Sequence, residues 1–425
     1  MAPRSPEDLA PERLPPQPWL SHPATKAVMA ALASAAGPED SRFVGGCVRN
    51  ALLGLPVTDI DIATRLTPEA VKAALGGAKI AAVPTGEAHG TITAISHGRA
   101  LEITTLRRDV ETDGRHAVVA FTSDWQVDAE RRDFRLNALY ADAEGRLFDP
   151  TGQGLADLKA GAIVFVGDPE QRIAEDALRI LRFFRFQAWY GRGPPHPASL
   201  AACGRLKELM LGLSVERVAK ELLGLMAADD PRPSLRAMAA AGVLSLALPE
   251  SGDPARFEQL VAIKTDLAIE ADPLLRLAAL IGPDPAKAQA ASTRLKLSNA
   301  QSARLVEATR VDPAIASWMS PKAVRQGLWR HGAAAFRDKL MLAWAGGDGA
   351  AMQWRALLPI AESWPRPVFP LTGAEVMAAG VPEGPRVGRV LAEVEAWWID
   401  SDFTSDKLSI IERLKAVVQG LGREA

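Results

Sequence analysis

The stretch "VTDIDIATRL", residues 57–66, places two aspartates, Asp59 and Asp61, inside a short apolar run. Side chains of a strand alternate between its two faces, so we expect both carboxylates on one face and Ile60 and Ile62 on the other. Two carboxylates this close repel each other and resist joint ionisation unless a cation lies between them. The alternative is an exposed edge strand, on which charge discourages aggregation.

The composition is typical of a globular protein. The chain has 425 residues, of which 48% are hydrophobic and 24% charged, enough for several domains. Its net charge is −2, so any nucleic-acid site must be a local patch. The two cysteines, Cys47 and Cys203, can form neither a disulfide framework nor a zinc cluster. No apolar run is long enough to span a bilayer, and the N-terminus lacks the apolar segment of a secretory signal. We therefore expect a cytoplasmic protein without a membrane partner, and we infer no stable protein partner.

The character of the sequence changes along the chain and predicts an α+β protein with several domains. Residues 1–17 are expected to form a flexible Pro-rich leader. Residues 18–150 mix helices with two-period strands, which indicates a small mixed sheet covered by helices. The remainder is almost wholly helical, and we expect boundaries that separate residues 151–230 from residues 231–425.

Most tryptophans are in the last third of the chain. We expect them to lie in the core of a helical region, because buried aromatic side chains are the usual case, with stacking on bases as the alternative. These seven residues are Trp318, Trp329, Trp344, Trp354, Trp364, Trp397 and Trp398.

The motif "GGCVRN", residues 45–50, combines features of an anion site. Gly45 and Gly46 let the backbone approach a ligand closely, and the N–H groups of the following helix attract anions. Arg49 adds a phosphate donor. A plain glycine-rich turn between a strand and a helix is the alternative.

The two aspartates follow this turn closely, since Asp59 is nine residues after Asn50. A phosphate cradle beside a carboxylate pair predicts a triphosphate bound with Mg²⁺, which prefers carboxylate oxygens shared with substrate phosphates. Such ions act on the attacking and leaving oxygens of phosphoryl transfer. Glu102, on another expected strand, is a candidate third acid, although the pattern does not exclude a side chain that faces solvent.

Two further motifs carry clustered arginines. "RRDFRLNAL", residues 131–139, suits a helix with phosphate or ribose contacts, and the alternative is a surface cluster of ion pairs. "EDALRILRFFRF", residues 175–186, is expected to form one helix in which Asp176 and Glu175 are neighbours of Arg179. An acceptor and a fork of donors together can recognise the edge of a base. The alternative is an amphipathic helix with ordinary ion pairs.

Six motifs in one order resemble the bacterial class II tRNA nucleotidyltransferase/poly(A) polymerase family. The resemblance covers about residues 42–225 and implies a polymerase-β-like nucleotidyltransferase head, followed by an all-α neck, body and tail. The family often has aspartate where this chain has Asn50, which preserves the shape of the side chain but not its charge. The motifs are VGGCVRNALLG, TDIDIAT, RRDFRLNAL, DPTGQGLADL, EDALRILRFFRF and SVERVAKEL.

The resemblance implies a role for each motif. Asp59 and Asp61 would bind catalytic Mg²⁺, with Glu102 as the further catalytic acid. Asp176 and Arg179 would bond to the incoming base, and Glu216 and Arg217 would brace the pocket from the next helix. The other residues implied to bind the nucleotide are Gly45, Gly46, Arg49, Arg131, Arg132, Asp133, Arg182 and Arg185.

The resemblance also implies an activity. We expect CMP and AMP, taken from CTP and ATP, to be added to the 3′ end of tRNA, with release of pyrophosphate. A poly(A) polymerase shares these motifs and is the alternative, and an enzyme that adds only part of CCA is another.

Overall fold

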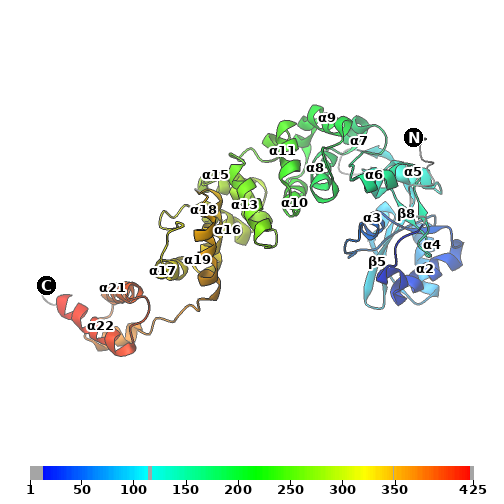
Figure 1. Ribbon diagram of the computed structural model, residues 1–425. Coiled ribbons are helices and arrows are strands. Elements are labelled where there is room, and N and C mark those ends of the chain that lie inside the picture. Colours follow the sequence, from blue (N-terminus) through cyan, green and yellow to red (C-terminus); the bar gives the residue numbers. More distant parts are fainter. Residues whose placement is uncertain (1–12, 113–116, 348, 422–425) are drawn as a thin grey trace. The chain divides into compact units, whose positions relative to one another are not determined.

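The computed structural model describes residues 13–112, 117–347 and 349–421. The chain forms two compact units (Figure 1). Unit 1 extends to Ser251 and includes two short later segments, residues 271–273 and 294–296. Unit 2 contains the rest of the chain from Gly252 onward. The division into leader, head, neck, body and tail remains a prediction within this frame.

A mixed seven-stranded sheet in unit 1 confirms the expected α+β class. Its order is β3-β4-β5-β2-β1-β8-β9, in which β2 and β5 pair in parallel and the other neighbours are antiparallel. Its strands are β1 (Ser41–Val44), β2 (Asp61–Thr64), β3 (Ala81–Gly86), β4 (Thr91–Ser96), β5 (Arg99–Thr105), β8 (Tyr140–Ala141) and β9 (Leu147–Phe148). A separate two-stranded sheet contains β6 (Arg107–Thr112) and β7 (Ala117–Phe121).

The opening stretch forms the middle of this sheet. Strand β2 begins at Asp61, and Ile60 and Ile62 are 5% and 0% exposed, which confirms the expected buried face. Helices α2 (Pro23–Ala36) and α4 (Pro68–Gly77) pack on the sheet (Figure 1). Thr67 starts α4 because its hydroxyl accepts a hydrogen bond from the Ala70 N–H.

Helices follow the sheet for the remainder of unit 1. Helix α8 packs against α10 and α11, and its buried apolar face contains Phe183 and Phe184. The helices of unit 1 not yet given are α1 (Pro18–Ser21), α3 (Gly46–Leu53), α5 (Trp125–Glu130), α6 (Gly154–Ala160), α7 (Pro169–Glu175), α8 (Leu178–Tyr190), α9 (Pro197–Arg205), α10 (Val215–Met226), α11 (Arg232–Ala240) and α12 (Leu244–Ala247). Short 3₁₀ turns span Glu87–His89, Arg135–Asn137 and Lys207–Gly212.

Unit 2 contains helices and connecting loops, and no strand, in its described residues. Its helices are α13 (Ala255–Asp266), α14 (Pro273–Ile281, whose first residue belongs to unit 1), α15 (Pro285–Arg294, whose last residue belongs to unit 1), α16 (Asn299–Thr309), α17 (Pro321–His331), α18 (Ala333–Ala345), α19 (Ala351–Ser363), α20 (Gly373–Ala378), α21 (Pro385–Asp400) and α22 (Lys407–Leu421). Trp344, Trp354 and Trp398 are buried as expected, whereas Trp318 is 80% exposed. None of the helices in the described ranges is long and apolar enough to cross a membrane.

Two local expectations were wrong. Residues 131–139 form a loop and a 3₁₀ turn instead of a helix, because Phe134 is extended and pairs with Phe165 in a buried bridge. The expected helix over residues 175–186 is interrupted at Asp176, which has an extended backbone between α7 and α8.

Most of the expected leader, residues 1–12, lies outside the described residues. Leu14 is buried and its N–H donates to the Gly145 carbonyl, whereas Arg13, Pro15 and Pro16 are exposed, so the leader as a whole remains a prediction.

Candidate active site

A strained glycine turn leads from β1 into α3. Gly45 has φ 72° and ψ −124°, a conformation that side chains disfavour. Its N–H donates to the Leu139 carbonyl at 3.3 Å, which ties the turn to the neighbouring chain. A Cβ atom on Gly45 would lie 3.7 Å from Nη1 of Arg132. The turn therefore brings the start of α3 next to a guanidinium, as an anion site requires.

The carboxylates lie on two adjacent parallel strands. Asp61 on β2 is directly in register with Glu102 on β5. Burial, followed by repulsion from Glu102, raises the pKa of Asp61 to about 6, and Asp59 adds a smaller effect. Asp59 is exposed just before the strand, and its carboxylate accepts a hydrogen bond from the Thr58 hydroxyl at 3.1 Å. The fold thus gathers the three acids expected from the sequence.

These acids have the chemistry of a shared metal site. Their oxygens are the ligands that hard divalent cations prefer, and a cation would relieve the repulsion that raises the Asp61 pKa. Within the described residues, no group of three His, Cys, Asp or Glu side chains is placed to hold a metal ion by itself. Two carboxylates with oxygens from a bound phosphate fit a divalent cation better than a closed protein site does.

Arg131 and Arg132 converge on a buried acid, Asp128, which the sequence analysis missed. Oδ1 of Asp128 accepts from Nε of Arg131 at 2.8 Å, and Oδ2 accepts from Nη2 of Arg132 at 2.9 Å. Burial opposes ionisation of Asp128, but the two arginines and the Tyr140 hydroxyl hold its pKa well below the ordinary range. The spacing of three and four residues between this acid and the arginines was the available signal.

Arg49 is buried and is surrounded by neutral partners. Its Nη1 donates to Asn137 at 2.6 Å, its Nη2 donates to the Tyr190 hydroxyl at 2.9 Å, and both Nε and Nη2 donate to Oδ1 of Asn50. The Asn50 amide in turn donates to the Pro56 carbonyl at 2.9 Å. Asn50 therefore orients the arginine without neutralising it, and burial lowers the pKa of Arg49.

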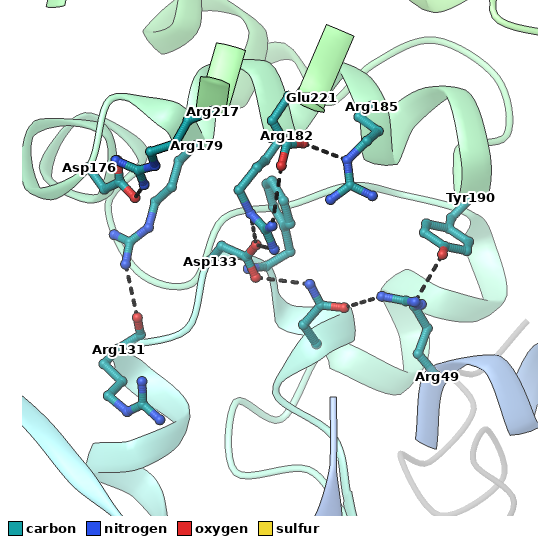
Figure 2. A network of polar contacts seen from close by, with 12 residues as sticks. Arg49, Arg131, Asp133, Asp176, Arg179, Arg182, Arg185, Tyr190, Arg217 and Glu221 are labelled. Carbon is teal, nitrogen blue, oxygen red and sulfur yellow. Dashed lines mark hydrogen bonds and ion pairs between the residues drawn. The ribbon is translucent and has the colours of Figure 1, made fainter. Parts of the chain in front are cut away.

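A polar network continues from Arg49 into the helices of unit 1 (Figure 2). Asn137 donates to Asp133 at 2.9 Å, and Asp133 accepts from Nε of Arg182 at 2.8 Å. Glu221 on α10, 5% exposed, accepts from Arg185. Asp133, Arg182 and Arg185 are thus brought together as expected, but as partners in a network that the motif spacing did not predict.

Asp176 and Arg179, the residues expected to recognise the base, form hydrogen bonds with other residues and not with each other in the described contacts. Asp176 accepts from Nη2 of Arg217 at 2.6 Å (Figure 2). Nη1 of Arg179 donates to Glu175 at 2.6 Å. Nη2 of Arg179 donates to the Arg131 carbonyl at 3.1 Å. Arg217 therefore braces Asp176, whereas Glu216 instead pairs with Lys296 at 2.7 Å on the surface.

Two family models match the chain in this region. The model described as "Poly A polymerase head domain" matches residues 41–164, which contain the glycine turn, the three acids Asp59, Asp61 and Glu102, and Arg131 and Arg132. The model described as "Probable RNA and SrmB-binding site of polymerase A" matches residues 195–252. The sheet and its site therefore belong to a nucleotidyltransferase of the polymerase-head class.

Relatives that match most of the chain specify the family. The mitochondrial CCA tRNA nucleotidyltransferase 1 of Mus musculus is 34% identical over 389 residues, which are 88% of this chain and 86% of the relative. The CCA-adding enzyme of Limosilactobacillus fermentum is 31% identical, over 88% of this chain and 92% of the relative. The chain belongs to the family of CCA tRNA nucleotidyltransferases, or CCA-adding enzymes.

Solved structures share the fold. The Bacillus stearothermophilus CCA-adding enzyme in complex with CTP aligns with a TM-score of 0.74 at 24% identity, over 95% of this chain and all of that one. The Thermotoga maritima CCA-adding enzyme complexed with tRNA aligns with a TM-score of 0.69 at 20% identity, over 98% of this chain and 99% of that one.

Proposed function

We propose that the chain adds CMP and AMP to the 3′ end of tRNA, from CTP and ATP, and uses Mg²⁺ as its metal. Enzymes of this nucleotidyltransferase family are generally metal-dependent. The proposal rests on one observation: a pair of acidic side chains and a site that attracts anions lie together at one end of the sheet. The carboxylates of Asp61 and Glu102 repel each other, and beside them the turn at Gly45 and the guanidinium of Arg132 attract anions. A nucleoside triphosphate with a divalent cation satisfies both groups.

In the proposed reaction, the deprotonated 3′ hydroxyl of the tRNA forms a bond to the α-phosphorus of the nucleotide. The bond from that phosphorus to the pyrophosphate oxygen breaks, and pyrophosphate leaves. Asp59 and Asp61 would hold Mg²⁺, with Glu102 beside Asp61. When bound, the ion supplies positive charge for the attacking and leaving oxygens.

The remaining residues are assigned to binding and positioning. The N–H groups of Gly45 and Gly46 and the free edge of Arg132 would bind the triphosphate, with Arg131 held beside Arg132 by Asp128. Arg49 would contribute mainly its charge, since four of its N–H groups already have protein partners.

Base recognition is assigned to Asp176 and Arg179. Arg217 orients the carboxylate of Asp176, and Glu175 orients the guanidinium of Arg179. An acceptor and a fork of donors held in this way can discriminate among bases by their hydrogen-bonding edges. Asp133, Arg182 and Arg185 would support the sugar and base side of the pocket.

A cytoplasmic location is part of the proposal. The relatives differ in this respect, since the Mus musculus relative is mitochondrial by name.

The reaction can be tested with tRNA transcripts that lack the CCA end. We expect CTP alone to give two additions, CTP with ATP to give three, and extension to stop there. A transcript that already ends in CCA is the control and should not be extended, and EDTA should abolish incorporation until Mg²⁺ is restored. Long A tails on unrelated RNA would contradict the proposal in favour of a poly(A) polymerase, and A addition that requires a preformed CC end would indicate partial addition.

A further inference from the structure

We propose that Asp128 and Tyr140 are positioning residues that hold Arg132 with its Nη1 atom facing the glycine turn, where the nucleotide triphosphate binds. This inference rests on the proposed function, because it takes the turn at Gly45 to be the triphosphate site.

Three side chains form a closed ring of hydrogen bonds. The Tyr140 hydroxyl donates to Oδ2 of Asp128 at 2.8 Å and accepts from Nε of Arg132 at 3.2 Å. The same Oδ2 atom accepts from Nη2 of Arg132 at 2.9 Å. One edge of the guanidinium is therefore bound to protein, which fixes the plane of the group.

The opposite edge of the guanidinium is available. Nη1 of Arg132 has no hydrogen bond to any residue that the structure describes. It lies 3.7 Å from the point where a Cβ atom of Gly45 would be. Its two N–H groups are therefore the donors that a phosphate at the start of α3 would meet, and they are oriented before the ligand arrives.

The ring is anchored to the same strand that carries the glycine turn. Tyr140 on β8 is 0% exposed and is the register partner of Val44, which immediately precedes Gly45. The edge of Trp125 packs against the Tyr140 ring, with centroids 5.3 Å apart. The hydroxyl of Tyr140 is thus held at a fixed position relative to the turn. Its hydrogen bond with Nε of Arg132 holds the guanidinium at a fixed position as well.

Asp128 adds the charge that makes this arrangement stable. Its carboxylate is 1% exposed, and its other oxygen accepts from Nε of Arg131 at 2.8 Å. One acid between two arginines leaves a net positive charge at the turn, whereas a separate carboxylate for each arginine would cancel it. The ring therefore orients Arg132 without removing its attraction for a polyanion.

The experiment measures steady-state kinetics of Tyr140→Phe with a tRNA that lacks CCA. Tyr140→Phe removes two hydrogen bonds to charged groups, so kcat/KM should fall about tenfold or more for both CTP and ATP, mostly through KM, with the KM for tRNA unchanged. Asp128→Asn keeps the size of the side chain but removes its charge and replaces one accepting oxygen by an NH2 donor, so it should weaken the binding of both nucleotides further. Ser41→Ala is the matched control, because it removes a buried hydroxyl contact of the same sheet, 2.9 Å from Thr64, away from the arginines.

A double-mutant cycle separates positioning from simple loss of stability. If Tyr140 acts through Arg132, then Tyr140→Phe should change kcat/KM by less than about twofold in an Arg132→Gln background. Unchanged KM values in Tyr140→Phe, equal loss in Ser41→Ala, or fully additive effects would each overturn the inference. Failure of the unmodified protein to add C and A would instead overturn the proposed function.

Discussion

At the scale of residues, the site consists of charges that the fold keeps partly uncompensated. Asp61 is partly buried beside Glu102 on the next strand, and this burial and the repulsion from Glu102 raise its pKa to about 6. Arg49 is buried among the neutral groups of Asn50, Asn137 and Tyr190. A metal ion would stabilise the acids, and a triphosphate would stabilise the arginine. We therefore assign the binding of both ligands to this site.

The first prediction concerns Asp61 and pH. Its pKa is about 6 in the folded chain and lower, about 4, in an unfolded one. Between these values the folded chain retains a proton that the unfolded chain releases, so this group lowers the free energy of unfolding as the pH rises from about 4 to 6. Asp61→Asn should therefore raise the unfolding free energy of the metal-free protein at pH 7.5 by about 1 kcal/mol, a value discounted for partial exposure.

Thermal unfolding at pH 4 and pH 7.5 checks this prediction. The variant and the unmodified protein should differ at pH 7.5 and agree at pH 4. Added Mg²⁺ should stabilise the unmodified protein but not the variant, and nucleotide transfer should be abolished while tRNA binding remains. An equal stability difference at both pH values would show that the carboxylate charge is not the cause.

At the scale of elements, the site depends on how strands and helices begin and end. Gly45 starts α3 with φ 72° and ψ −124°, and Gly54 ends the same helix with φ 68° and ψ 21°. A Cβ atom on Gly45 would lie near Arg132, whereas one on Gly54 meets nothing within 4 Å. Substitutions of these two glycines therefore compare the N-terminal end of α3, where we place the phosphates, with its C-terminal end, where we place no ligand.

The second prediction compares these glycines. Gly54→Ala should cost about 1 kcal/mol of stability and leave kcat/KM unchanged. Gly45→Ala should cost about 1–3 kcal/mol and lower kcat/KM for CTP and ATP at least tenfold, because it displaces the phosphate-binding N–H groups. Denaturant unfolding and nucleotide kinetics on both variants decide the matter. Similar kinetics in the two variants would exclude a role of the turn in catalysis.

At the scale of the whole molecule, the chain is divided into two compact units. All proposed nucleotide contacts lie in unit 1, which contains Trp19, Trp125 and Trp189. The other seven tryptophans lie in unit 2, from residue 318 to residue 398. Trp fluorescence therefore reports mainly on unit 2, and nucleotide binding acts on unit 1.

The third prediction uses this separation. We expect CTP with Mg²⁺ to raise the temperature of the calorimetric transition of unit 1. A CTP concentration of 100 times Kd should increase the free energy of unfolding of this unit by about 2.7 kcal/mol. The main transition followed by Trp fluorescence should stay at the same temperature. A single transition that moves as a whole in both measurements would mean that the units unfold as one cooperative body.

The sequence by itself determined the α+β class and the residues that gather at the site. Those features are local: the alternation of Asp59, Ile60, Asp61 and Ile62 predicts a polar and a buried side, although the strand itself begins at Asp61, and paired glycines mark a turn. The breaks at residues 131–139 and at Asp176 escaped this reasoning, because burial of Phe134 and the junction of α7 with α8 depend on distant partners.

Only the tertiary structure decided which charges meet. Asp61 reaches Glu102 through parallel pairing across some forty residues of chain, and Tyr140 meets Asp128 because β8 pairs with β1. The physical reason is that hydrogen bonds and charge pairs act over a few ångströms of space, whatever the separation along the chain. Pattern and spacing thus indicate which residues carry the chemistry, and the fold selects the partner that orients each of them.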